Sequence, residues 1–140
     1  MTAPSVDGRS TSSLEASLDA EVDRFDRFAF GLVRLEPHPV DELRRSIDRF
    51  TGEVAGHLTR SPSRDLPSNL EQEHERFRES LVELRSLLAV VEREDHGGHR
   101  QALGQYGRIF AEAMRRHRAD ERAFFAVREV GPPSGGPGKR

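Results

Sequence analysis

Residues 68–91, SNLEQEHERFRESLVELRSLLAVV, contain the pattern that decides the fold class. Their apolar residues recur at steps of three, four or seven positions: Leu70, Phe77, Leu81, Leu84, Leu88 and Val91. Because an α-helix turns once in about 3.6 residues, these positions share one face of a helix. Ser68 followed by Glu71 has the spacing of a capping box, which predicts that the helix begins at Ser68. Gly97 and Gly98 predict where it ends.

Three further segments have the same periodicity. The first begins at Ser12, with Glu15 as its capping-box partner, and its apolar face comprises Leu18, Val22, Phe25, Ala29 and Leu32. The second begins near Pro39 and ends at Ser61, which precedes a proline, and its apolar face comprises Val40, Leu43, Ile47, Phe50 and Val54. The last ends before Gly131 and carries Leu103, Tyr106, Phe110, Ala113 and Phe124.

These segments predict an all-α domain, an up-down-up-down four-helix bundle over residues 13–129. Long helices joined by short connections are typical of that architecture, and no segment alternates apolar and polar residues as a strand would. Residues 1–12 and 130–140 are rich in Ser, Thr, Gly and Pro. Because such segments bury little apolar surface, both are predicted to be disordered tails.

The composition excludes several classes of protein. The 140 residues include 22 Lys+Arg and 24 Asp+Glu, so the basic excess of a nucleic-acid-binding protein is missing. No apolar run approaches the roughly 18 residues of a membrane-spanning helix, and the first residues lack the order of a signal peptide, which predicts a cytoplasmic location. The chain has no cysteine, so thiolate metal sites and cysteine nucleophiles are excluded. No phosphate-binding loop or hydrolase motif is present, so nothing in the sequence favours an enzyme.

Three histidines interrupt the apolar faces. His57, His74 and His117 occupy inward positions of the second, third and fourth predicted helices, respectively. In an antiparallel bundle these positions lie towards the same end, with a mismatch in depth of roughly 10 Å at 1.5 Å per residue. Glu121 follows His117 by one turn on the same face, although Asp120 competes for that inward position. Neutral imidazole together with carboxylate suits iron, manganese or zinc, so these residues are candidate metal ligands.

Other interpretations stay open at this point. Each histidine alone could be an ordinary buried side chain, although burying three polar groups without partners is costly. Glu53 could supply a carboxylate from the second helix, and Asp19 or Asp23 could supply one from the first, where a solvated acidic face is the default. His96 and His99, in the sequence His-Gly-Gly-His, are expected to belong to a glycine-rich turn rather than to a metal site.

Two stretches resemble helices of the hemerythrin-like, or histidine–histidine–glutamate (HHE) cation-binding, family. Residues 70–88, LEQEHERFRESLVELRSLL, resemble its third helix, and residues 106–125, YGRIFAEAMRRHRADERAFF, resemble its fourth. Residues 52–58, GEVAGHL, are similar to the end of its second helix. The resemblance implies a four-helix bundle that holds non-haem iron, with the ligands His57, His74, His117 and Glu121.

The chain departs from the family pattern at two positions. Ser61 stands where a carboxylate normally follows the second-helix histidine by one turn, and the predicted first helix has no histidine. The resemblance therefore implies either one iron ion or a pair, with zinc or no metal as alternatives. Bound iron with an open position implies sensing, storage or detoxification of O2, NO or peroxide. The competing hypothesis is a non-catalytic helical interaction module that keeps the fold and has lost its metal.

Overall fold

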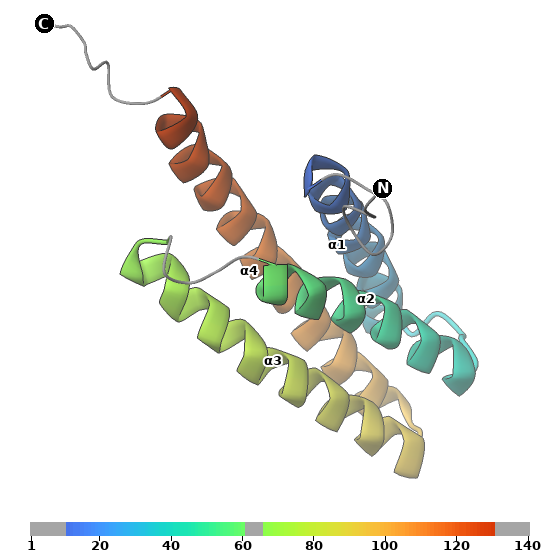
Figure 1. Ribbon diagram of the computed structural model, residues 1–140. Helices are drawn as coiled ribbons and strands as arrows, with labels where there is room; N and C mark the ends of the chain where they lie inside the picture. Colours follow the sequence, from blue (N-terminus) through green and yellow to red (C-terminus); the bar gives the residue numbers. More distant parts are fainter. Residues whose placement is uncertain (1–10, 61–65, 131–140) are drawn as a thin grey trace, which may run out of the picture.

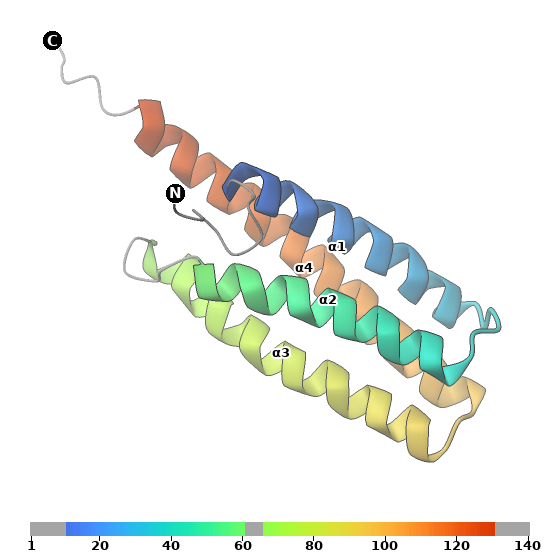
Figure 2. The same cartoon turned by 45° about the vertical axis from the view of Figure 1, so that its right-hand side comes forward.

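The computed structural model of the chain describes residues 11–60 and 66–130, which form four α-helices and, over those ranges, no strand. The helices are α1 (Thr11–Val33), α2 (Val40–Arg60), α3 (Ser68–Arg93) and α4 (Gly97–Val130). Both α1 and α3 pack against α2 and α4, and consecutive helices run in opposite directions (Figures 1 and 2). The predicted all-α four-helix bundle is therefore confirmed, whereas the two predicted tails lie almost entirely outside the described residues. No helix of the described part is long and apolar enough to cross a membrane.

α3 begins at Ser68, as predicted, but the predicted capping mechanism is wrong. Pro67 is the N-cap, and its carbonyl oxygen accepts hydrogen bonds from the backbone N–H groups of Leu70 (3.0 Å) and Glu71 (3.1 Å). Ser68 is therefore already helical, and no side-chain hydrogen bond caps the helix. The predicted capping box of Ser68 and Glu71 does not form.

The glycines after α3 begin the next helix instead of ending this one. α3 ends at Arg93, and α4 begins at Gly97. The ring of His96 caps α4, because its Nδ1 accepts hydrogen bonds from the backbone N–H groups of Gly98 (3.1 Å) and His99 (3.4 Å). A side-chain acceptor at this place satisfies N–H groups that have no partner within the helix.

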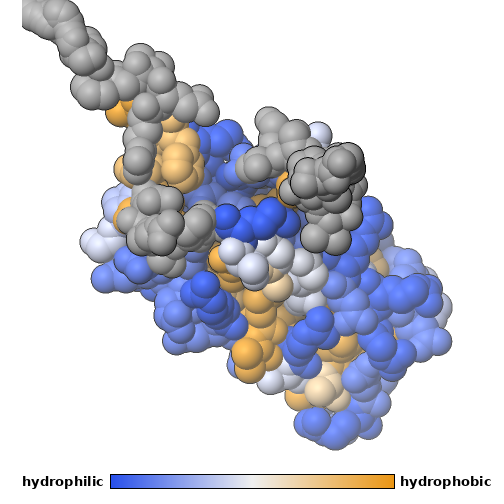
Figure 3. Space-filling view, viewed as in Figure 1, coloured by the Kyte–Doolittle hydropathy of each residue, from blue (hydrophilic) through white to orange (hydrophobic). Residues whose placement is uncertain are grey.

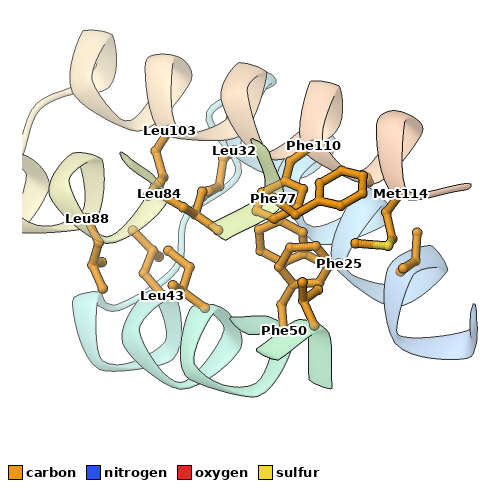
Figure 4. Packing of buried hydrophobic residues seen from close by; sticks show 14 of the residues in the cluster. Phe25, Leu32, Leu43, Phe50, Phe77, Leu84, Leu88, Leu103, Phe110 and Met114 are labelled. Atoms are coloured by element: carbon orange, nitrogen blue, oxygen red, sulfur yellow. The ribbon is translucent and has the colours of Figure 1, made fainter. Parts of the chain in front are cut away.

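A layer of four phenylalanines crosses the middle of the core, and each helix contributes one ring (Figure 4). Phe25 and Phe50 stack at 4.0 Å between ring centroids, Phe50 and Phe110 form a T-shaped pair at 5.1 Å, and Phe77 stacks on Phe110 at 5.8 Å. Such aromatic pairs add about 0.5–1.5 kcal/mol each beyond the burial of their area. Leucines fill the core on one side of this layer, among them Leu43, Leu84, Leu88 and Leu103.

The orientation of α4 differs from the expectation, whereas its end before Gly131 is confirmed. Ala113 is exposed, whereas Ala111 and Met114 are fully buried, so the predicted apolar face is wrong at Ala113. α4 also projects beyond the neighbouring helix ends (Figures 1 and 2). The sequence predicted that His117 would lie deeper in the bundle than His57 and His74. Because the last turns of α4, up to Val130, extend past the other helices, His117 lies beside the other two histidines instead.

The projecting part of α4 keeps apolar residues at its surface. Figure 3 shows a largely hydrophilic face with apolar patches, one of them on this part of the helix. Val127 is 70% exposed there. A single exposed apolar residue is normal for a soluble surface, so the patch alone identifies no partner.

Gly104 lets α4 approach the backbone of α1. A Cβ atom on Gly104 would lie 2.6 Å from the carbonyl oxygen of Ala29 and 2.9 Å from the Cβ of Leu32. We expect Gly104→Ala to lower the free energy of unfolding by about 1–3 kcal/mol, because the helices must separate. Gly52→Ala is the matched control, since nothing lies within 4 Å of a Cβ there, and it should gain about 0.5–1 kcal/mol. Urea denaturation measures both, and equal stability of Gly104→Ala and the wild type would contradict the close contact.

Candidate metal centre

The structure brings together all four residues that the sequence nominated. His57 lies near the end of α2, His74 in the second turn of α3, and His117 and Glu121 on one face of α4. Each is at most 3% exposed. Their candidate ligand atoms all lie within 4.8 Å of one another, so the group could hold a metal ion. The ring of Phe77 packs edge-on against His117 at 5.1 Å, which places the centre directly beyond the phenylalanine layer.

All three imidazoles present Nε2 to the carboxylate of Glu121. Its Oε1 lies 3.0 Å from His57 Nε2, and its Oε2 lies 2.9 Å from His117 Nε2 and 3.2 Å from His74 Nε2. His74 Nε2 and His117 Nε2 are 2.9 Å apart. When two ligand atoms bind the same ion at about 2.0–2.1 Å, they lie about 2.9 Å apart if the angle at the ion is a right angle. They lie about 3.4 Å apart if that angle is tetrahedral. The observed separations fit ligands of a single ion.

The hydrogen bond at the far side of the His117 ring determines what its Nε2 can do. His117 Nδ1 donates to Glu73 Oε1 at 2.7 Å, so a neutral His117 carries a lone pair on Nε2. That lone pair would face Glu121 Oε2, which is an acceptor as well. A positive charge, either a proton or a metal ion, is therefore needed between them.

In the absence of metal, the pKa shifts show how a proton meets this need. Burial lowers the pKa of His117, but the hydrogen bonds with Glu121 and Glu73 outweigh burial and raise it above the ordinary value. Burial also raises the pKa of Glu121, but hydrogen bonds from His117, His57 and His74 reverse this effect and hold it far below the usual range. The centre therefore favours a carboxylate and a bound cation over a neutral pair.

One polar atom of the centre has no partner. His74 Nδ1 is buried and makes no hydrogen bond within the part of the chain that the structure describes. Leaving a buried donor or acceptor unpaired costs about 1–3 kcal/mol. The position of His74 is thus explained by the contacts of its Nε2 with His117 and Glu121, and not by a hydrogen bond at Nδ1.

Two important residues escaped the sequence analysis, and one of them is Arg118. Arginine is usually a surface residue, yet Arg118 is only 3% exposed. Its NH1 group donates to Glu121 Oε1 at 3.1 Å and its Nε to Asp19 Oδ1 at 3.0 Å. α1 therefore reaches the centre through Asp19 and Arg118. The other residue is Glu73, whose sequence position beside His74 gives no sign that it bonds to His117.

The other candidate carboxylates lie outside the centre. Asp120 is exposed, which leaves the inward position to the next residue of α4. Glu53 accepts a hydrogen bond from Ser17 at 3.3 Å. Asp23 pairs with Arg115 at 3.0 Å. Of the α1 acids, Asp23 fits the expected solvated face, whereas Asp19 departs from it because it binds the buried Arg118.

A second cluster of Glu94, His96 and His99 lies at the opposite end of the bundle and is largely exposed. Because His96 Nδ1 accepts backbone N–H groups, its neutral ring carries the proton on Nε2. That ring cannot cap α4 and bind an ion through Nε2 at the same time. The cluster therefore belongs to the helix cap, in line with the expectation of a turn.

Two hollows approach the centre from different sides. A groove of about 980 Å³ is lined by Glu73 and Phe77, both of which contact His117. A smaller one of about 380 Å³ is lined by Asp19 and Arg118 on the α1 side. A small molecule or ion thus has a path to the residues that surround the centre from either side.

We expect Glu73→Gln to weaken metal binding by roughly 10–100-fold, because a carboxylate that accepts from a ligating imidazole fixes its tautomer and increases its basicity. Competition with a chromophoric chelator measures the affinity. Glu75→Gln is the control, since Glu75 is exposed and pairs with Arg78 at 3.3 Å. Wild-type affinity in Glu73→Gln would show that the 2.7 Å contact with His117 has no role in binding.

Comparisons with protein-family models, with curated proteins and with solved structures each find no match for this chain. The family resemblance of the third and fourth helices therefore has no support beyond the residues that carry it. The function is inferred from the geometry of the centre.

Proposed function

We propose that this protein is a hemerythrin-like, metal-binding four-helix bundle that holds one non-haem iron ion through His57, His74, His117 and Glu121. The separation of 2.9 Å between His74 Nε2 and His117 Nε2, beside a buried carboxylate, carries the proposal. Nitrogen atoms that face each other this closely need either a hydrogen atom or a metal ion between them. A proton can serve only one pair of them, whereas a metal ion can serve all three imidazoles and the carboxylate.

The donor set supports iron without excluding manganese or zinc. Three imidazoles and one carboxylate suit these ions, whereas calcium and magnesium prefer oxygen ligands. Four protein ligands leave positions for a further ligand on an ion that takes five or six. Bound iron would supply a redox change and an open position for O2, NO or peroxide.

The residues around the centre orient its ligands and exclude water. Glu73 fixes the His117 ring through Nδ1, and Phe77 covers that ring from the side of the core. Arg118 holds Glu121 Oε1, so Oε2 is directed at His74 and His117. These residues therefore orient and enclose the ligands. The proposed function is accordingly binding, and hence sensing, storage or detoxification, instead of hydrolytic catalysis.

Metal analysis tests the proposal directly. Wild-type protein produced with iron and purified without oxygen should contain about one iron per chain, and the His74→Ala and His117→Ala variants should contain almost none. An optical spectrum of the loaded protein distinguishes one ion from an oxo-bridged pair, which absorbs in the near-ultraviolet. Wild-type protein that retains no iron, manganese or zinc would overturn the proposal.

The competing hypothesis is an interaction module without metal. Apolar residues exposed on α4, Ile109 at 68% and Val127 at 70%, are the observation that favours it. In that case the buried histidines would serve only packing, and the stability of the protein would not depend on metal. The effect of metal on the melting temperature separates the two hypotheses.

A further inference from the structure

A permanent positive charge lies beside the candidate metal centre. The guanidinium of Arg118 is surrounded by three carboxylates: Glu121 at 3.1 Å, Asp19 at 3.0 Å and Glu15 at 3.7 Å. Two of them come from α1 and one from α4, so a single buried cation joins the two helices. Arginine remains charged in proteins, and a buried charge persists only where opposite charges surround it.

A shell of three carboxylate groups with an open approach has the chemistry of a divalent-cation site. Carboxylate oxygens are the ligands that manganese, magnesium and calcium prefer. The hollow of about 380 Å³ reaches this shell at Asp19 and Arg118, and Arg115 and Arg122 also line it. What fills the shell in this chain is a side chain instead of an ion.

We propose that Arg118 is a built-in cation that limits the centre to one metal ion, and that Glu15, Asp19 and Glu121 take up a second divalent cation when the guanidinium is removed. The inference rests on the proposed function, because the first ion shares Glu121 with Arg118. It names Arg118 as the residue that determines how many ions the centre holds. The fixed charge satisfies Glu121 Oε1 and repels any second cation from the same carboxylates.

The test is the number of Mn²⁺ ions that each variant binds at saturation, measured by elemental mass spectrometry after removal of free metal. Wild-type protein should bind one ion per chain. Arg118→Met keeps an unbranched apolar side chain but removes the charge, and it should bind about two. Electron paramagnetic resonance gives an independent readout, because two neighbouring Mn²⁺ ions couple and one alone does not.

Two further variants show whether the charge is the cause. Arg118→Lys keeps a positive charge and should bind one ion. Arg122→Met is the matched control, because Arg122 also contacts Asp19, at 3.0 Å, but is 55% exposed and makes no hydrogen bond or ion pair with the four candidate ligands within the described residues. It should bind one ion as well. Two ions in either variant would contradict the role given to the Arg118 charge.

The outcomes separate this inference from the proposed function. One ion in Arg118→Met, or none, overturns the inference, whereas no ion in the wild type overturns the proposed function itself. Adding Asp19→Asn to Arg118→Met should return the count to one, since it removes a carboxylate of the second position. Far-ultraviolet circular dichroism confirms that each variant is helical. If Arg118→Met does not fold, saturation of the wild type decides, because a second bound Mn²⁺ there contradicts the inference directly.

Discussion

Saturating Fe²⁺ or Zn²⁺ should raise the melting temperature of the wild-type protein by more than about 10 °C, and His117→Ala should abolish that rise. A ligand that binds only the native state at 1,000 times its dissociation constant stabilises that state by about 4 kcal/mol. For a domain of this size, about 1 kcal/mol corresponds to several degrees. The effect is large because the four ligands come from three helices, so unfolding separates them all.

His117 is the most informative ligand to remove. Its ring contacts His74, Glu121 and Glu73 at 2.9, 2.9 and 2.7 Å, so its loss dismantles the centre and leaves Glu73 without its partner. His99→Ala is the control, because it removes a histidine from the cluster at the opposite end and should preserve the full metal effect. Differential scanning calorimetry with metal and with chelator measures both. A wild-type melting temperature that is the same in both conditions would contradict metal binding to the native state and leave the metal-free interaction module as the hypothesis.

The fold follows from the sequence because the burial of one face of each helix sets the spacing of the apolar residues. The apolar faces of the first three helices predict most of their buried apolar residues, although Val40 and Leu81 are only half-buried, and His57 and His74 stand at buried positions of the same faces. Antiparallel order then places the end of α2 and the start of α3 together. Residue periodicity therefore suffices to predict the fold and to nominate His57 and His74.

Rotation of α4 about its axis is the part that periodicity predicts poorly. The predicted apolar face through Ala113 gives α4 the wrong rotation about its axis. The contact with α1 is made at glycines, which carry no hydropathy signal. Cβ atoms on Gly104 and Gly107 would lie within about 3 Å of α1 atoms. This close approach turns Met114 inward and Ala113 outward. The same rotation settles the competition that the sequence left open, in favour of Glu121 over Asp120.

The residues that surround the ligands could not be predicted, because their contacts join different helices. Glu73 is next to His74 in the chain but bonds to His117 on α4. Arg118 is of a residue type that usually lies at the surface. Its burial is explained by its ion pairs with the carboxylates of α1. Sequence spacing describes neighbours on one helix, whereas these contacts depend on the packing of two.

The metal-free protein should be most stable between about pH 5 and pH 6.5, and it should lose stability on both sides. The pKa of Glu121 is lowered on folding, so its contribution is present above the unfolded value of roughly 4.3 and is lost as the pH falls below it. The pKa of His117 is raised on folding. Its contribution is therefore present below the unfolded value of roughly 6.5 and is lost as the pH rises through the folded value.

Bound metal should change the alkaline side of this profile. The ion takes the place of the proton on His117 Nε2, so loaded protein gains stability up to neutral pH, where the metal-free protein loses it. On the acid side both forms should weaken, because protons compete for Glu121 and for the imidazoles. The two profiles should therefore diverge above pH 6.5 and converge below about pH 5.

Urea denaturation from pH 3 to pH 9, with chelator or with Zn²⁺, measures both profiles. We expect the metal-free wild type to lose up to about 2 kcal/mol between pH 6 and pH 3, because a carboxyl group that stays ionised in the folded state contributes about 1.4 kcal/mol per pH unit below its unfolded pKa of roughly 4.3. Glu121→Gln keeps the shape of the side chain but cannot ionise, so most of this acid-dependent loss should vanish. An acid-dependent loss of the same size in Glu121→Gln would mean that surface carboxylates cause it, and the charge pairing assigned to the buried centre would then be wrong.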